Sequence, residues 1–193
     1  MKKFELTNEF ITNMFGTKLF RIRALVEFGD VEAGELGGYV EKESNLGHDD
    51  NAWVYDNARV YGDAQVSGDA RVYGNARVYG NALVCGDALV CGNARVCSDA
   101  LVCGNARVCS DEDYAYAHGF GSVNRTTTFF RLKDGGVGVR CGCFYGTLAQ
   151  FRDKIRETHG ETKKAQEYLM LADLMELRFE EDENEVGNRK YVE

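Results

Sequence analysis

Apolar and polar positions alternate with a period of six through the middle third of the chain. From Asn51 to Ser110, ten units follow one another, each with Asn or Asp first, Ala second and Val fourth, and most with Gly last. Side chains alternate along an extended segment, so the Ala and Val of each unit share one face. Gly, Asn and Asp tolerate positive φ, so each junction can turn sharply. We predict short strands separated by corners, stacked into coils that bury the shared Ala and Val face.

The units NAWVYD, NARVYG, DAQVSG, DARVYG, NARVYG, NALVCG, DALVCG, NARVCS, DALVCG and NARVCS resemble the hexapeptide-repeat family. That family forms a left-handed parallel β-helix with three such strands per coil. The resemblance implies eighteen residues per coil and about three and a third coils over residues 51–110. Val40, Leu46 and Ala52 are also six apart and predict an opening coil, and an irregular closing unit is expected at residues 111–116.

The segment before the repeats is predicted to be a small β cap. Phe4 and Leu6 alternate with polar residues in one strand, residues 19–24 alternate in another, and residues 15–17 supply the turn. Such a cap would cover the unpaired edge of the first coil. The predicted domains are an N-terminal β cap (1–35), a hexapeptide-repeat β-helix (36–118) and a C-terminal ββαα module (119–193).

The C-terminal module is predicted from two changes of pattern. Residues 126–132 and 137–144 alternate on either side of a Gly-rich turn, which predicts a β-hairpin. Thr147 and Gln150 have capping-box spacing at the start of a helix, and an apolar stripe predicts a second helix over 163–176. The whole chain is therefore expected to be mainly β, with two helices at its end.

Composition narrows the range of partners. The net charge of −8 argues against a general nucleic-acid binder. The opening MKKFELTNEF has two lysines but no apolar run after them, so we predict neither a signal peptide nor a transmembrane segment. We expect a cytoplasmic protein with no membrane partner.

Five of the seven cysteines take the fifth position of successive units: Cys85, Cys91, Cys97, Cys103 and Cys109. Their spacing follows from the repeat, so it is not a disulfide code. Stacking by eighteen residues places Cys85 over Cys103 and Cys91 over Cys109. We expect reduced thiols that act as small apolar side chains. These columns lack His and carboxylate partners, so neither a metal site nor a cofactor is predicted.

Many hexapeptide-repeat proteins are acyltransferases that use acetyl-CoA or acyl carrier protein, with a catalytic His on a coil or on a loop projecting from it. The ten units here contain no His and no inserted loop. His48 and His118 lie outside the units and are only fallback bases for such a reaction. A non-catalytic protein is favoured, and an acyltransferase using acetyl-CoA is kept as an alternative.

The outward positions carry the candidate binding site. Arg59, Arg77 and Arg95 stack in one column, and Tyr61 and Tyr79 lie beside them. Like charges at the strand spacing of about 4.8 Å repel, which favours an anion between them. Arg binds phosphate or carboxylate bidentately, and Tyr can stack on a ring. A nucleotide-like anion is the expected ligand, and the alternative of an ordinary exposed face paired with nearby Asp residues stays open.

Another column is apolar. Leu83 and Leu101 stack there beside Cys85 and Cys103. Such a patch on a protein surface usually marks an interface. Hexapeptide-repeat proteins are commonly trimers packed along the sides of the helix, so the resemblance implies that these four residues form a homotrimer interface.

The order of the parts resembles uncharacterised phage and prophage proteins, through FRIRALVEFGDVEAGELGGYVEKESNL, the repeats, and RTTTFFRLKDGGVGVRCGCFYGTLAQFRDKIRETHG. The resemblance implies a viral origin and action in the host cytoplasm, and it carries no catalytic residues. The leading hypothesis is a non-catalytic oligomeric binding protein. It would sequester a host nucleotide signal or block a host defence protein. A structural protein of the virion or its assembly is a further alternative.

Overall fold

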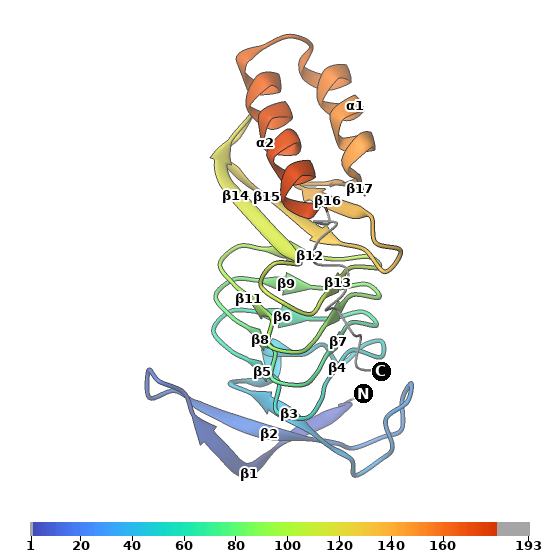
Figure 1. Cartoon of the computed structure of the whole chain (residues 1–193). Coiled ribbons are helices and arrows are strands. Elements are labelled where there is room, and N and C mark those ends of the chain that lie inside the picture. Colours follow the sequence, from blue (N-terminus) through green and yellow to red (C-terminus); the bar gives the residue numbers. More distant parts are fainter. Residues whose placement is uncertain (1, 181–193) are drawn as a thin grey trace.

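A solenoid of stacked coils forms the middle of the molecule, with a β cap at one end and a sheet with two helices at the other (Figure 1). The computed structural model describes residues 2–180. The solenoid strands are β4 (Trp53–Val54), β5 (Arg59–Val60), β6 (Gln65–Val66), β7 (Arg71–Val72), β8 (Arg77–Val78), β9 (Leu83–Val84), β10 (Leu89–Val90), β11 (Arg95–Val96), β12 (Leu101–Val102) and β13 (Arg107–Val108). The fold is mainly β, as predicted.

Three parallel sheets run along the solenoid, one on each side. Their strand orders are β4-β7-β10-β13, β6-β9-β12 and β5-β8-β11, the last being part of a larger sheet with the cap. Arg59 pairs with Arg77 and Arg77 with Arg95, so each coil advances the chain by eighteen residues. Backbone N–H groups donate to the next coil, as from Arg77 to the Ala94 carbonyl at 2.9 Å. The predicted three strands per coil are confirmed.

The inner columns of Ala and Val form the core of the solenoid. The Ala and Val side chains of all ten units are fully buried. Most corners depend on glycine: Gly68 has φ 70°, and a Cβ there would lie 2.8 Å from the backbone nitrogen of Gly86 in the next coil. Small inward side chains and glycine corners together allow the coils to stack closely.

An opening coil precedes the ten units, as predicted, but it is longer than they are. It begins with β3 (Leu36–Val40) and includes a short 3₁₀ helix (Glu43–Asn45), and Leu46 bridges to Val66 in the next coil. Leu46 and Val54 are eight residues apart, whereas their partners Val66 and Val72 are six apart. The predicted period of six therefore fails between Leu46 and Val54, where the chain carries two additional residues.

The N-terminal cap is an antiparallel hairpin of β1 (Phe4–Thr12) and β2 (Lys18–Ala24), which projects beyond the solenoid (Figure 1). The predicted strands and turn are confirmed. Trp53 takes the third position of the first unit, which points outward in the later units, but it is fully buried. The rings of Phe4 and Phe28 pack against its indole at centroid distances of 6.2 and 5.3 Å. The cap thus covers the first coil.

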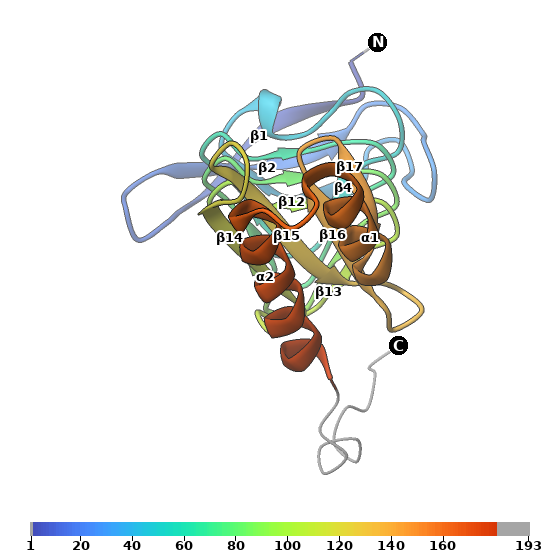
Figure 2. The same cartoon turned by 90° about the horizontal axis from the view of Figure 1, so that it is seen from above.

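The C-terminal module is a four-stranded antiparallel sheet, β14 (Tyr114–Phe120), β15 (Arg125–Arg131), β16 (Val137–Cys141) and β17 (Phe144–Thr147), followed by α1 (Leu148–His159) and α2 (Lys163–Phe179). The predicted hairpin, both helices and the Thr147–Gln150 capping box are confirmed. Strands β14 and β17 were not predicted. Figure 2 shows the helices lying over the sheet, where α1 packs on β16 and β17 and α2 packs on β14.

Candidate functional site

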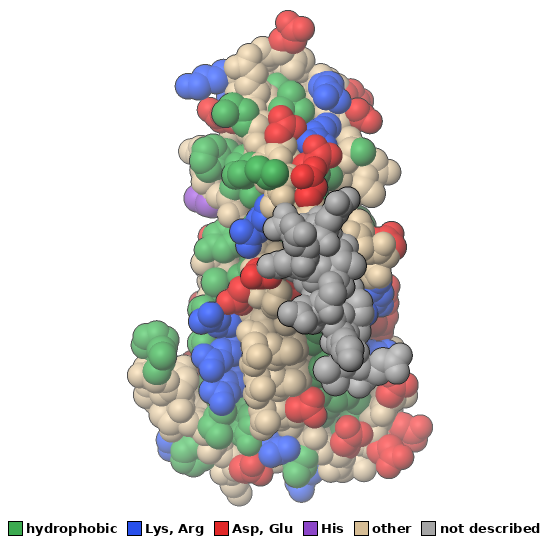
Figure 3. All heavy atoms as spheres, in the orientation of Figure 1, with side chains coloured by type: hydrophobic (Ala, Val, Ile, Leu, Met, Phe, Trp, Pro, Cys, Tyr) green, Lys and Arg blue, Asp and Glu red, His purple; other side chains and the backbone are tan. Residues whose placement is uncertain are grey.

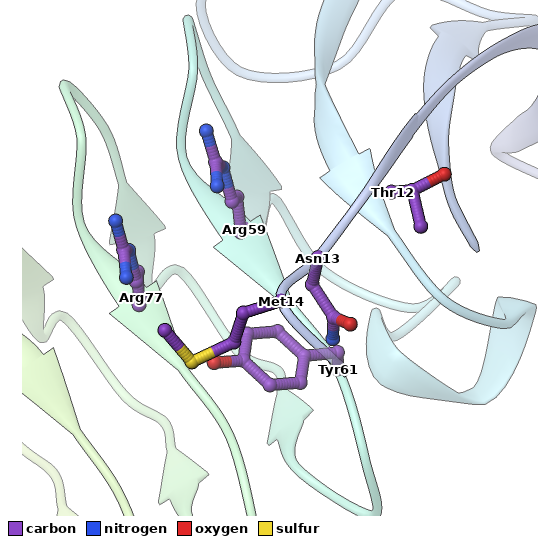
Figure 4. A pocket seen from close by; sticks show the side chains of 6 residues that line it. All are labelled: Thr12, Asn13, Met14, Arg59, Tyr61 and Arg77. Atoms are coloured by element: carbon purple, nitrogen blue, oxygen red, sulfur yellow. The ribbon is translucent and has the colours of Figure 1, made fainter. Parts of the chain in front are cut away.

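The β1–β2 hairpin and two solenoid coils enclose a shallow cavity, which we call the arginine groove. Its volume is about 160 Å³, and it is lined by Thr12, Asn13, Met14, Arg59, Tyr61 and Arg77 (Figure 4). Three of the five residues predicted to bind a ligand therefore line one cavity. In Figure 4 the two guanidinium groups extend side by side in the same direction from neighbouring strands.

The two arginines of the groove are unpaired among residues 2–180. Arg59 and Arg77 are direct partners on β5 and β8, and the side chains of both lack an ion pair or hydrogen bond to any other described residue. Arg95 continues the same column, but Asp111 binds its guanidinium at 2.9 Å. Figure 3 shows the column of basic side chains on the solenoid, beside the projecting hairpin with its apolar tip. Only the first two members of the predicted column thus keep an uncompensated charge within the described chain.

Tyr61 forms the aromatic part of the groove. Its ring stacks on that of Tyr79 with centroids 5.1 Å apart and an interplanar angle of 4°. Burial raises the pKa of Tyr61, while the charges of Arg77 and Arg59 oppose that shift. Burial and a hydrogen bond with Cys97 raise the pKa of Tyr79 to about 12. Both phenols are therefore protonated at neutral pH, and Tyr79 supports Tyr61 without lining the groove.

The hairpin tip supplies the other wall. The Asn13 side-chain oxygen accepts hydrogen bonds from the N–H groups of Phe15 and Thr17, at 2.9 and 3.0 Å, which shapes the turn. Met14 and Phe15 are 84% and 78% exposed. Neither Asn13 nor Met14 is predicted as a site residue, because periodicity does not reveal where a hairpin tip lies. Two large apolar residues in an otherwise polar turn are the one signal available in the sequence.

The two fallback histidines lie apart from the groove and from each other. His48 stacks on Phe4 at 4.5 Å between ring centroids, and its Nδ1 accepts the backbone N–H of Lys3 at 3.2 Å. His118 lies on β14, where its Nδ1 is hydrogen-bonded to the Thr126 hydroxyl at 2.9 Å. The structure does not bring either one to a cavity-lining position in the arginine groove.

The predicted interface residues lie on the β9–β12 side of the solenoid. Leu83 pairs with Leu101 across these strands. The Leu101 N–H donates to the Thr128 hydroxyl of β15 at 2.9 Å, and Cys103 is buried. The C-terminal sheet therefore contacts this side of the last coil. A role for these residues in oligomer formation stays a prediction.

The thiols of Cys91 and Cys109 are not free, contrary to expectation. They form a disulfide across neighbouring coils, with Cα atoms 4.3 Å apart. The parallel register of β10 and β13 brings the two residues to the same position on adjacent coils. This stacking is the physical reason that the two sulfur atoms come within bonding distance.

The described residues are also notable for what they do not contain. No set of three or more His, Cys, Asp or Glu side chains within residues 2–180 is arranged to hold a metal ion. No helix in this same range combines the length and apolar character needed to cross a lipid bilayer.

Together, the stacked coils and their columns define a parallel β-solenoid of the hexapeptide-repeat type, with a cationic groove on one side. The family model described as "YdcK Beta solenoid repeat" matches residues 52–68, 64–78, 70–86 and 76–92. Over these residues the repeats are similar to that β-solenoid repeat family, and with the observed coils they form a hexapeptide-repeat-like β-helix. No curated protein matches the chain. The resemblance to phage proteins is not confirmed and stays a prediction.

Proposed function

We propose that the protein is a non-catalytic binding protein that holds a nucleotide-like anion in the arginine groove. The observation that carries this proposal is the pair of directly stacked guanidinium groups of Arg59 and Arg77, which no described carboxylate neutralises. Two positive charges at about 4–5 Å repel by roughly 1 kcal/mol at the dielectric of water. A phosphate bound between them removes this repulsion and gains charge-assisted hydrogen bonds.

The lining of the groove supports a ligand with both an anionic group and a ring. Each guanidinium offers a planar fork of donors that matches two phosphate oxygens. Tyr61 presents a protonated phenol and an aromatic ring, and Met14 presents a polarizable thioether. A cavity of about 160 Å³ is smaller than ordinary ligand pockets of about 300–1,000 Å³. The groove thus contacts the anionic group and part of the ring, and the rest of the ligand extends into solvent.

Calorimetric titration of the full chain with a panel of linear and cyclic nucleotides and inorganic phosphate tests this proposal. We expect at least one nucleotide to bind, with an affinity lowered about tenfold or more by Arg59→Gln or Arg77→Gln. Arg71→Gln is the matched control, because Arg71 is an exposed arginine on another side of the solenoid that pairs with Asp30 at 3.2 Å. Absence of binding, or equal binding by Arg77→Gln and wild type, would overturn the proposal.

Oligomer formation and biological setting are separate parts of the proposal. We propose a homotrimer that uses the side of Leu83 and Leu101, and light scattering that gives a monomer would reject it.

We also propose that the bound nucleotide is a host signal in a phage-infected cell, or that a host defence protein is the partner. A cytoplasmic location is part of this proposal, although the Cys91–Cys109 disulfide is more typical of oxidising compartments.

Neither alternative gains a specific observation from the described residues. An acyltransferase needs a base within reach of a bound acceptor, and both His48 and His118 are hydrogen-bonded away from the groove. A virion or assembly role remains an alternative that purified particles would test.

A further inference from the structure

The cysteine pair Cys85 and Cys103 repeats, on another side of the solenoid, the arrangement of the disulfide Cys91–Cys109. Both pairs take the fifth position of units eighteen residues apart. β9 pairs with β12 in the same parallel register as β10 with β13. The Cys85 N–H donates to the Val102 carbonyl at 3.0 Å, and the Cys91 N–H donates to Val108 at 2.8 Å. The backbone geometry that joins one pair is thus present at the other, whose thiols are free.

The surroundings of the two thiols give them different chemical roles. Cys103 is 8% exposed and packs with the solenoid core, whereas Cys85 is half-buried. The Cys103 thiol donates a hydrogen bond to the Cys85 sulfur, which lowers the pKa of Cys85 to about 6 and raises that of Cys103. Arg140 of β16 adds a positive charge that favours the thiolate of either residue. At neutral pH the half-buried Cys85 is therefore mainly a thiolate, and the buried Cys103 keeps its proton.

We propose that, in a protomer whose β9–β12 side is open to solvent rather than covered by a partner, Cys85 and Cys103 form a thiol–disulfide exchange site, at which a small-molecule disulfide closes a second cross-link between neighbouring coils. The Cys85 thiolate attacks one sulfur of the disulfide and releases one small thiolate, which leaves a mixed disulfide on Cys85. Cys103 then gives its proton to solvent, and its sulfur attacks the Cys85 sulfur and releases the second thiolate. Two protein thiols are oxidised to one disulfide, and one small disulfide is reduced to two thiols.

The cross-link would act where the solenoid meets the C-terminal module. Strand β12 contacts β15 through the hydrogen bond from Leu101 to Thr128. Oxidation would tie this last β9–β12 step together and remove the thiolate beside Arg140. The pair thus couples the redox state of the surroundings to the junction between solenoid and C-terminal sheet.

Oxidation of a Cys91→Ser/Cys109→Ser variant by glutathione disulfide tests the proposal. The variant is first reduced and then exposed to glutathione disulfide at pH 7. Acid stops the exchange, alkylation blocks the remaining thiols, and trypsin then cleaves after Arg77, Arg95 and Arg107. We expect a cross-link between peptides 78–95 and 96–107 that fragmentation places at Cys85 and Cys103.

Single substitutions in the same background assign the two roles. In Cys103→Ser the cross-link should vanish, and the glutathione adduct should accumulate on Cys85. Cys97→Ser, which changes the other cysteine of peptide 96–107, should leave the cross-link unchanged. Modification of the exposed Cys143 shows that the exposure to glutathione disulfide was sufficient. If Cys85 and Cys103 are then both still alkylated as free thiols, the proposal is overturned. A cross-link through Cys97 would also overturn it.

Arg140 is a positioning residue in this proposal and has its own readout. The charged and titratable groups that act on Cys85 are Cys103 and Arg140. Arg140→Gln should slow alkylation of Cys85 by iodoacetamide at pH 7 about threefold and move its pH profile to higher pH. Cys143 is the internal standard, and circular dichroism checks the fold. An unchanged Cys85 profile in Arg140→Gln would contradict the assigned role of Arg140.

Discussion

Arg77 and Arg95 occupy neighbouring coils of one column, and they are paired through the same backbone register. Arg77 opens onto the groove beside the β1–β2 hairpin, whereas Arg95 is bound by Asp111, just after the last repeat unit. The repeat gives both residues the same position. The segments outside the repeat make Arg77 a candidate ligand contact, whereas they make Arg95 one partner of an ion pair. Under the proposed function, binding is therefore decided where non-repetitive segments meet the solenoid.

The same substitution at the buried residue that follows each arginine tests whether the two coils contribute equally to stability. Val78 and Val96 are both fully buried, and truncation of either to Ala removes two methyl groups and leaves a cavity. We expect each variant to lose about 2–3 kcal/mol of unfolding free energy. Urea denaturation measures the loss of unfolding free energy. A difference of more than about 1 kcal/mol between the two variants would show that the coils are not equivalent.

A second test concerns Lys3, a buried cation of the cap. Its ammonium donates to the carbonyls of Asp50 and Ala52, and burial lowers its pKa from 10.5 to about 8. Between these values the unfolded chain binds more protons than the folded chain, so this group makes stability rise with pH over the window. We expect wild type to gain about 1–2 kcal/mol relative to Lys3→Met between pH 7.5 and 10.

Urea denaturation of wild type and Lys3→Met across this pH range measures the difference in their unfolding free energies. Tyrosines and cysteines titrate in both proteins, so their contribution cancels in this difference. A gap between the two proteins that is constant with pH would contradict the shifted pKa of Lys3.

A conservative change separates charge from geometry in the column. Arg77→Lys keeps the positive charge but loses the planar donor fork. We expect nucleotide affinity to fall about tenfold, whereas Arg95→Lys should change it less than twofold. Calorimetry of both variants makes the comparison, and equal losses would place Arg95 in the site as well.

The smallest expected effect comes from releasing Arg95. Asp111→Asn removes the carboxylate charge that holds this guanidinium, so the unpaired column would extend from two arginines to three. We expect affinity for a nucleoside triphosphate to rise about threefold and that for a monophosphate to stay unchanged. A rise that is the same for both nucleotides would point to a general charge effect instead.

The repeat made much of the fold predictable. A six-residue period determines which residues stack, so the arginine column and the interior columns followed directly from counting. The cap hairpin and the two helices also had clear alternation or capping signals. Strand β14 is not apparent in the sequence, because residues 114–120 lie partly in the expected closing unit (111–116) and partly across the expected domain boundary.

The site itself was only half predictable. Arg59, Arg77 and Tyr61 belong to the periodic part, but Met14 and Asn13 reach them through a tertiary contact that no local pattern encodes. The pairing of Arg95 with Asp111 has the same origin. The burial of Trp53 is also a tertiary effect, because an outward position of the first coil becomes interior once the cap packs on it.

The most direct test of the central claim is calorimetric titration of wild type, Arg77→Ala and Arg95→Ala with the nucleotide that wild type binds best. If flanking segments decide function, Arg77→Ala should lose at least tenfold in affinity and Arg95→Ala less than twofold. Equal losses in the two variants, or no loss in Arg77→Ala, would contradict the claim.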